Sequence, residues 1–383
     1  MHICIVIGNT HPNRKLNLNV GGVANQLLLL LHSYEKIKDI KISLITKYSE
    51  YIPISNKVKI YRIHKFNNFY IDTLYFLIKT PFKIIKIHKK EPISIINLHQ
   101  YTVFMLFPIL IRLIFKIPIL MKFPQTFQNL NREINEPKKI RMKLYGYSWL
   151  KFFTRILLKK INYIRAINDE IYNQIKKLNY PEENILRIPN GILTERFLAI
   201  KKEERDHINY SFIGRFIALK NIRYLLKVFR NYLTIYPNDE LLLYGEGPEE
   251  QYILNYIKNN NLESKVILKG FEKDKTKIYS KNDVLINPSF GEGISNVILE
   301  AMSTGTFVIA SNVYGNRDLI KDHFNGLLFN LKDENDLLNK LIYYKENANM
   351  IEEILKNAKE LVLSKYDINL ITYQIYQFLK QKI

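Results

Sequence analysis

Residues 288–310 combine two glutamates with the expected start of a helix, an arrangement that suits a sugar joined to a diphosphate. The segment reads PSFGEGISNVILEAMSTGTFVIA. Its pattern predicts a glycine-bearing loop, a helix with Ser295 as the N-cap, and a strand. The N–H groups and positive dipole end of such a helix attract phosphates. Glu292 precedes the helix and Glu300 lies about two turns along it, so one carboxylate could meet a sugar and the other a more distant part of the ligand.

This segment resembles the motif of two glutamates separated by seven residues in retaining glycosyltransferases of family 4, a large family of bacterial envelope enzymes with the GT-B fold. The family pattern is close to E-G-x-x-x-x-x-x-E-A-M-A-x-G-x-P-V-I-A. The matching residues are Glu292, Gly293, Glu300, Ala301, Met302, Gly305, Val308, Ile309 and Ala310. The chain departs from the pattern at Ser303 and at Phe307, where the family usually has proline.

Two basic residues follow the first expected strand of the second half. That strand, at 210–213, ends in Gly214-Arg215, and Lys220 comes five residues later. Taken alone, an arginine and a lysine at this spacing are more often a solvated helix start. Before the glutamate motif they resemble the family's G-R pair and its following lysine. The resemblance implies that Arg215 clamps two diphosphate oxygens and that Lys220 adds a point charge.

Two glycine-containing stretches extend the resemblance, although each is weak evidence by itself. Gly245-Glu246-Gly247-Pro248 resembles the family's G-x-G-P turn, which we interpret mainly as structural. Asn190-Gly191 resembles the N-G pair before the interdomain linker, but the acidic residue that usually follows it is absent.

The first half contains weaker candidates. Gly21-Gly22 resembles the family's G-G loop, where a backbone without side chains can approach an acceptor or a phosphate closely; a glycine helix entry without a ligand is the alternative. His99 follows the strand expected at 93–98 and resembles a catalytic histidine facing the cleft, although a lone histidine is usually structural or exposed. The family often has a second histidine after the next strand. Residues 121–126 contain none, and Lys122 or Gln125 are candidates to replace it.

The resemblance also implies a mechanism. Breaking a sugar–diphosphate bond develops negative charge on the leaving group, which fixed positive groups stabilise. The implied groups are Arg215, Lys220 and the N–H groups of Gly293, Ile294, Ser295 and Asn296. Glu292 would contact the hydroxyls of the donor sugar, Glu300 would bind the ribose, and the anomeric configuration would be kept. We expect no metal and no cofactor, and the sequence has no D-x-D motif.

Short apolar runs separated by longer mixed segments must position these residues. They predict strands at 3–7, 42–45, 58–63, 93–98 and 117–123, and a second series at 210–213, 240–244, 266–268, 284–286 and 306–310. Strands alternating with helices indicate an α/β fold, and the GT-B resemblance implies two Rossmann-like doubly wound parallel-sheet domains facing across a cleft. We predict an N-terminal acceptor-binding domain at 1–195, onto which a helix at 366–383 packs back, and a C-terminal domain for the nucleotide-sugar donor at 196–365.

The charge is unevenly distributed along the 383 residues. The formal net charge is +21, and residues 1–200 hold 32 Lys and Arg against 12 Asp and Glu. An AT-rich genome would explain abundant lysine but not this asymmetry, so we expect an acidic partner for the first half. Residues 137–163 hold eight Lys or Arg, aromatic residues and no acid, which favours contact with an anionic membrane; an ordinary packed surface helix is the alternative.

The location follows from further features. The single cysteine, Cys4, fits a reducing compartment, and no transmembrane helix or signal peptide is expected. We therefore expect a cytoplasmic protein, peripheral on the inner face of the cytoplasmic membrane. The predicted partners are a nucleotide-sugar, such as a UDP- or GDP-sugar, a lipid-linked saccharide acceptor of envelope polysaccharide synthesis, and this membrane.

Three alternatives remain open. A sugar-nucleotide epimerase or a phosphorylase with the same fold would share the donor-site residues, but an epimerase would leave no transfer product. A basic membrane- or nucleic-acid-binding protein without catalysis would explain the charge, although no recognised nucleic-acid module is present. An inactive scaffold is disfavoured because both glutamates and both cations are intact.

Overall fold

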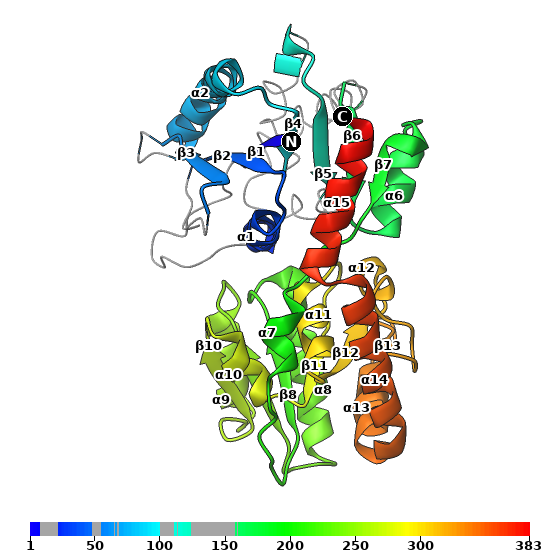
Figure 1. The fold of residues 1–383 in the computed structure, drawn as a ribbon. Helices are drawn as coiled ribbons and strands as arrows, with labels where there is room; N and C mark the ends of the chain where they lie inside the picture. The colour runs from blue at the N-terminus through cyan, green and yellow to red at the C-terminus, as the bar shows by residue number, and fades with distance from the viewer. Residues whose placement is uncertain are drawn as a thin grey trace. The chain divides into compact units, whose positions relative to one another are not determined.

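The computed structural model describes residues 1–7, 22–47, 55–64, 66, 69–99, 111–112, 114–123, 158 and 160–383. The chain forms two compact units (Figure 1). Unit 1 comprises Met1–Asn190 with Ile368–Ile383, and unit 2 comprises Gly191–Asp367. The sequence places these divisions after residues 195 and 365.

Unit 1 is built on a seven-stranded sheet in the order β3-β2-β1-β4-β5-β6-β7. All of its neighbouring strands pair in parallel. The strands are β1 (His2–Ile7), β2 (Lys41–Thr46), β3 (Val58–Arg62), β4 (Ile95–Leu98), β5 (Ile119–Phe123), β6 (Tyr163–Ala166) and β7 (Ile185–Arg187). Strands β1, β2, β4 and β5 are almost entirely buried, as expected for parallel strands covered on both faces.

Helices from both ends of the chain complete unit 1. They are α1 (Gly22–Glu35), α2 (Phe69–Lys90), α6 (Asp169–Lys176), a 3₁₀ turn (Glu182–Asn184) and the last helix, α15 (Ile368–Lys382). Helix α15 packs on α1, where the hydroxyl of Ser33 donates to Oδ1 of Asn369 at 3.0 Å. The C-terminal helix therefore returns to the first unit of the chain.

Unit 2 is built on a six-stranded parallel sheet in the order β10-β9-β8-β11-β12-β13. The strands are β8 (Asn209–Ile213), β9 (Glu240–Tyr244), β10 (Val266–Gly270), β11 (Val284–Asn287), β12 (Phe307–Ser311) and β13 (Leu327–Phe329). The helices are α7 (Thr194–Leu198), η4 (Ala218–Lys220), α8 (Ile222–Leu233), α9 (Glu250–Asn259), α10 (Lys275–Ser280), α11 (Asn296–Ser303), α12 (Tyr314–Arg317), α13 (Asp336–Glu346) and α14 (Ala348–Lys365).

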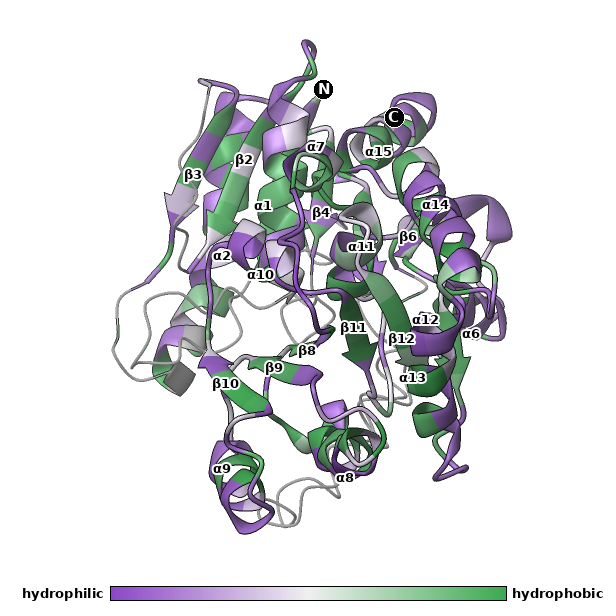
Figure 2. Cartoon of the chain, turned by 90° about the horizontal axis from the view of Figure 1, so that it is seen from below, coloured by the Kyte–Doolittle hydropathy of each residue, from purple (hydrophilic) through white to green (hydrophobic). Residues whose placement is uncertain are grey.

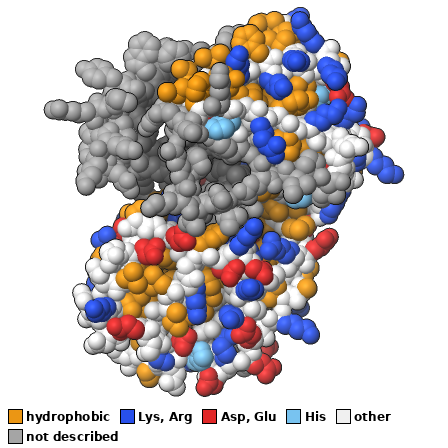
Figure 3. All heavy atoms as spheres, turned by 90° about the vertical axis from the view of Figure 1, so that its left-hand side faces the viewer, with side chains coloured by type: hydrophobic (Ala, Val, Ile, Leu, Met, Phe, Trp, Pro, Cys, Tyr) orange, Lys and Arg blue, Asp and Glu red, His pale blue; other side chains and the backbone are white. Residues whose placement is uncertain are grey.

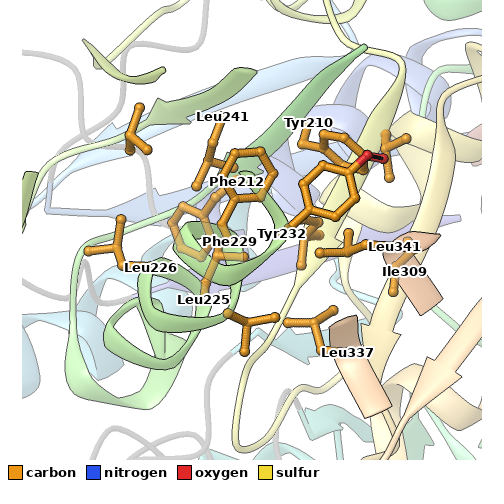
Figure 4. Packing of buried hydrophobic residues seen from close by; sticks show 14 of the residues in the cluster. Tyr210, Phe212, Leu225, Leu226, Phe229, Tyr232, Leu241, Ile309, Leu337 and Leu341 are labelled. Carbon is orange, nitrogen blue, oxygen red and sulfur yellow. Dashed lines mark hydrogen bonds between the residues drawn. The ribbon is translucent and has the colours of Figure 1, made fainter. Parts of the chain in front are cut away.

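The core of unit 2 follows from the alternation of side chains along its strands. Tyr210 and Phe212 point to one face, where they pack with residues of α8 and α13 (Figure 4). Leu242 and Tyr244 point to the other face and pack against α10. In Figure 2, hydrophobic colouring runs along β11 and β12, whereas α9 and α14 include hydrophilic turns.

The charge asymmetry is visible on the molecular surface. In Figure 3 the acidic side chains gather on unit 2, where basic ones are interspersed with them, whereas basic side chains predominate on the described part of unit 1. Among the described residues, no helix combines the length and apolar character that crossing a bilayer requires. Most of the predicted membrane segment, residues 137–157 and 159, lies outside the described residues.

The predicted doubly wound α/β fold is confirmed in both units, and every strand range predicted from sequence overlaps a strand of the structure. Three strands of the described residues were not predicted. β7 and β13 have three residues each, and β6 has four, including a buried arginine. Segments this short offer too little alternation to be recognised as strands.

Candidate active site

The candidate site lies at the carboxyl ends of β8 and β11, where the strand order of unit 2 reverses. In the sheet order β9-β8-β11-β12 the chain crosses over between β8 and β11. Open α/β sheets bind ligands outside the strand ends at such a switch point. The loops that leave the two strands are joined by a backbone hydrogen bond from the N–H of Phe290 to the carbonyl of Leu219, at 2.9 Å. This bond brings the two predicted motifs to one place.

Glu292 is held by three donors on one carboxylate oxygen. Its Oε1 accepts hydrogen bonds from Nζ of Lys220 at 2.5 Å, from the hydroxyl of Ser289 at 2.7 Å and from Nδ2 of Asn287 at 3.3 Å. Burial raises the pKa of Glu292, but the charge and hydrogen bond of Lys220, with the bonds from Ser289 and Asn287, lower it further than burial raises it. Glu292 is therefore an ionised carboxylate whose Oε2 makes no hydrogen bond within the described part of the chain.

The two predicted cations differ in their surroundings. Lys220 ends the 3₁₀ turn η4 and reaches Glu292, with 24% of its side chain exposed. The left-handed conformation of Asn221 (φ 54°) then turns the chain into α8. Arg215 is exposed, and its guanidinium has no ion-pair or hydrogen-bond partner among the residues that the structure describes. It is available to a ligand.

Helix α11 starts as predicted, with Ser295 in the N-cap position. The side chain of Ser295 makes no capping hydrogen bond to the first turn. Instead, the hydroxyl of Ser295 accepts a bond from Nδ2 of Asn287 at 3.4 Å. The amide of Asn287 thus joins the end of β11, Glu292 and the start of α11 in one network.

Glu300 lies in the buried second turn of α11, with 5% of its surface exposed. Its Oε2 accepts a hydrogen bond from the hydroxyl of Tyr279 at 2.9 Å and forms an ion pair with Lys275 at 3.2 Å. Both partners belong to α10. Its Oε1 makes no hydrogen bond in the described ranges of the chain, so Glu300 resembles Glu292 in having one satisfied and one open oxygen.

Glycines allow these loops to approach one another. A Cβ on Gly245 would lie 1.9 Å from the carbonyl oxygen of Gly214, and one on Gly247 would lie 2.4 Å from that of Phe216. The predicted structural role of this turn therefore has a geometric basis: it supports the segment that carries Arg215. In the same way, a Cβ on Gly315 of α12 would lie 1.8 Å from the carbonyl oxygen of Gly293. The backbone of Gly315 thus packs directly against the loop that carries Glu292.

Several residues of the site were not identified from sequence. They are Asn287, Ser289, Gly315, Lys275 and Tyr279. Asn287 and Ser289 could have been found, because both are polar residues at a predicted strand end next to the glutamate motif. Lys275 and Tyr279 gave no such signal, since only the fold brings α10 to α11.

The candidates of unit 1 lie at the carboxyl ends of its own strands. His99 directly follows β4 and is 1% exposed, and Lys122 lies in β5 and is 2% exposed. Burial, followed by the charges of Lys122 and Arg165, holds the pKa of His99 well below its usual value. Gly22 is the first residue of α1, whereas Gly21 and Gln125 lie outside the described residues. Within the described ranges no group of three His, Cys, Asp or Glu side chains is placed to hold a metal ion.

Two family models match successive parts of the chain. The model of Glycosyltransferase Family 4 matches residues 20–196, and the model of Glycosyl transferases group 1 matches residues 195–361. Together they extend over most of the chain and meet near the division between the two units.

Curated relatives are glycosyltransferases as well. The chain is 27% identical over 303 residues to UDP-Gal:alpha-D-GlcNAc-diphosphoundecaprenol alpha-1,3-galactosyltransferase of Escherichia coli, covering 76% of each protein. It is 28% identical over 212 residues to poly(ribitol-phosphate) alpha-N-acetylglucosaminyltransferase of Staphylococcus aureus, covering 54% of this chain and 41% of that protein.

Solved structures share the complete fold. Sucrose-phosphate synthase of Thermosynechococcus elongatus has a TM-score of 0.80 at 19% identity, covering 99% of this chain and 98% of that one. Anabaena HepE, solved with UDP and glucose, has a TM-score of 0.76 at 16% identity, covering 100% of both chains. From the family models, the curated relatives and the two parallel-sheet units, the chain belongs to the family 4 glycosyltransferases and has the GT-B fold.

Proposed function

We propose that the protein transfers a sugar from a nucleotide-sugar to a lipid-linked saccharide in envelope polysaccharide synthesis, with retention of configuration and without a metal. The observation that carries this proposal is the Lys220–Glu292 pair at the switch point of unit 2, next to the N-terminus of α11. At this position a cation and a helix N-terminus suit the diphosphate of the donor, and a carboxylate suits the hydroxyls of its sugar.

The positive groups of the site suit the leaving group. As the bond between the sugar and the diphosphate breaks, negative charge grows on the phosphate oxygens. The exposed guanidinium of Arg215 can clamp two of these oxygens, and Lys220 can add a point charge. The backbone N–H groups of residues 293–296 complete the proposed diphosphate site. Because these groups supply the positive charge, the proposed reaction needs no metal.

The two open carboxylate oxygens suit hydroxyl groups. Oε2 of Glu292 can accept a hydrogen bond from a hydroxyl of the donor sugar while its Oε1 stays fixed by three donors. Oε1 of Glu300 can accept bonds from the ribose while Tyr279 and Lys275 fix its Oε2. Fixed acceptors lose little freedom when the ligand binds, which favours affinity and orientation. In unit 1, Gly21, Gly22 and His99 stay proposed contacts for the substrate.

The relatives suggest the classes of substrate. One relative uses a UDP-sugar and an acceptor whose sugar is joined to diphosphoundecaprenol, and one solved neighbour binds UDP and glucose. We therefore propose a UDP-sugar as the first donor to test and a saccharide on a lipid diphosphate as the first acceptor.

Helix α2 supports the proposed contact with a membrane. Its residues Ile71, Leu74, Ile78 and Phe82 are 46% to 65% exposed and follow one another at spacings of three or four, which places them on one helix face. The helix also contains five lysines, at 79, 83, 86, 89 and 90, and its one acid, Asp72, is buried. An apolar stripe flanked by cations suits the interface of an anionic bilayer (Figure 3). This contact would place the enzyme on the inner face of the cytoplasmic membrane.

The membrane contact can be tested with vesicles. Phe82→Glu should reduce co-sedimentation with vesicles containing phosphatidylglycerol, because it places a negative charge in the apolar stripe. Leu363→Glu alters an exposed leucine of α14 in unit 2 and is the matched control. Equal binding of both variants and the wild type would contradict the proposed role of α2.

The transfer reaction can be tested with a panel of UDP-, GDP- and ADP-sugars in the presence of EDTA. Nucleotide release from one donor should rise when a bacterial lipid extract is added, and a glycosylated lipid should appear with retained configuration. An epimerase would convert the donor without any transfer product. Release that requires a divalent metal, or that is unchanged in Glu292→Ala, would contradict the proposal.

A further inference from the structure

Three basic side chains form a row across the carboxyl ends of β4, β5 and β6 in unit 1. Lys122 of β5 and Arg165 of β6 are register partners in the parallel ladder, so their side chains leave the same face of the sheet about 4.8 Å apart along the ladder. Leu98 pairs with Met121, which places the next residue, His99, opposite Lys122. This row lies next to β1, where the strand order of unit 1 reverses.

These basic side chains are buried, and no acid of the described residues lies beside them as a counter-charge. His99, Lys122 and Arg165 are 1%, 2% and 2% exposed. Burial first, and then the positive charge of Arg165, hold the pKa of Lys122 well below its usual value. The buried acids in the described ranges of unit 1 are engaged elsewhere: Asp72 pairs with Lys47 and His64, and Glu35 accepts from the N–H of Ser55.

Two hydrogen-bonding atoms at the row have no partner among the residues that the structure describes. They are Nδ1 of His99 and the hydroxyl of Tyr34 in α1, and both are buried. Tyr34 lies close enough to Arg165 for the arginine charge to act on its hydroxyl. Arg165 uses its Nε and one Nη to bind the carbonyls of Ile188 and Pro189. The polar groups at the row that are not engaged by these bonds are therefore mostly hydrogen-bond donors.

A buried set of donors that carries positive charge and lacks an acid is costly unless an anion completes it. We propose that His99, Lys122, Arg165 and Tyr34 form a binding site for a phosphate group in unit 1. A phosphate supplies both the missing charge and several acceptor oxygens, and it accepts charge-assisted hydrogen bonds from lysine and arginine.

The proposed function identifies the natural source of this phosphate, and to that extent the inference rests on it. The chain needs an acceptor as well as a donor, and the acceptor proposed above carries its sugar on a diphosphate. A site for phosphate in unit 1, separate from the residues of unit 2 that are proposed for the donor, therefore selects acceptors with a phosphate next to the sugar. Free inorganic phosphate is the other source with the same chemistry.

Thermal unfolding tests the site without catalysis. Inorganic phosphate and pyrophosphate, compared with chloride at equal ionic strength, should raise the melting temperature of the wild type. Lys122→Met keeps the length of the side chain and removes its charge, so this rise should be reduced. Lys41→Met removes an exposed lysine that pairs with Glu91 and is the matched control. An equal rise in Lys122→Met and the wild type, or no rise in either, would overturn the site.

UDP added to the same proteins separates this inference from the proposed function. UDP should stabilise Lys122→Met as much as the wild type, because the donor residues are in unit 2. If UDP stabilises neither protein, the proposed donor site in unit 2 is rejected. The result with phosphate still tests the proposed phosphate site in unit 1.

Kinetics then distinguish the two sources of phosphate. Lys122→Met should raise KM for an acceptor sugar on a lipid diphosphate by roughly tenfold or more, since a hydrogen bond to a charged group is lost. KM for the donor and for the same sugar on a neutral alkyl chain should stay as in the wild type. An equal KM change for both acceptors would show that the site does not recognise the acceptor's phosphate.

Discussion

Both sheets carry charged residues at the carboxyl ends of their strands, but those of the glutamate motif in unit 2 are paired, whereas those of the basic row in unit 1 have no acid beside them in the described residues. In unit 2 each glutamate of the motif has a lysine partner, Glu292 with Lys220 and Glu300 with Lys275. In unit 1, Lys122 and Arg165 are buried beside each other and no acid of the described ranges accompanies them. The paired site is fixed before a ligand arrives, whereas the unpaired one is completed only by a ligand of opposite charge. The contrast matches a donor site that must be rigid and a second site that selects an anion.

The largest effect is expected from Glu292→Ala. In the proposed mechanism this carboxylate orients the donor sugar, and its loss also leaves Lys220 without its partner. Turnover should fall by roughly 10²- to 10³-fold, as for other fixed polar groups that stabilise a transition state. Initial rates with saturating donor measure this. Glu334→Ala removes an exposed glutamate that pairs with Lys227 and should leave the rate unchanged.

Replacing one lysine in each unit tests the contrast itself. Lys220→Met leaves the carboxylate of Glu292 without its cation and should lower the free energy of unfolding by about 2 kcal/mol. Lys122→Met removes a buried charge that has no acid beside it in the described ranges, and it should raise the free energy of unfolding by about 1 kcal/mol or more in phosphate-free buffer. Urea unfolding of both variants gives the two values. Destabilisation of equal size in both would remove the distinction between the sites.

The pKa of Lys122 gives this second effect a dependence on pH. Because its pKa is lowered in the folded protein, the cost of burying Lys122 is fully present below that lowered value. The cost disappears as the pH rises toward the ordinary pKa of lysine. The advantage of Lys122→Met should therefore shrink in alkaline buffer.

A smaller effect is expected where α10 supports Glu300. Tyr279→Phe keeps the buried ring and removes the hydroxyl that donates to Oε2 of Glu300. Because this bond fixes Glu300 for the ribose, its loss should weaken the binding of the nucleotide by about 1 kcal/mol, or roughly fivefold. Calorimetric titration with the nucleotide measures it. Tyr236→Phe removes an exposed bond to Glu346 and is the control that should bind normally. A normal affinity in Tyr279→Phe would show that Glu300 does not depend on α10.

The smallest effect is expected in the loss of stability at acid pH. The pKa of Glu292 is lowered in the folded protein, so its ionised form adds stability above the ordinary carboxyl pKa, and this stability is lost as the pH falls through the lowered pKa. The difference in melting temperature between the wild type and Glu292→Gln should be constant near neutral pH and should shrink in acid. A difference that grows in acid would mean that Glu292 is protonated at neutral pH.

The sequence predicted those parts of the molecule that depend on local pattern. Apolar runs located ten of the thirteen strands that the described residues form, and the position of Ser295 marked the start of α11. The family pattern singled out Glu292 and Lys220, which the structure joins by a hydrogen bond.

Contacts between distant segments could not be read from the sequence in this way. Lys275 and Tyr279 reach Glu300 only because α10 and α11 cover the same face of the sheet. Arg165 had no pattern to mark it, since a buried arginine within a four-residue strand resembles a loop. Gly315 was missed because its role is a close approach of two backbones, which leaves no trace in spacing.

Nucleotide binding by unit 2 is the most direct test of the proposed donor site. Calorimetric titrations of UDP, GDP and ADP would be made in EDTA with the wild type and with Lys220→Met. We expect that one nucleotide binds the wild type without a metal and that Lys220→Met weakens this binding by about tenfold or more, because a charge-assisted bond to the diphosphate is lost. Binding of the same strength in both proteins, or no binding of any nucleotide, would contradict the assignment of this site.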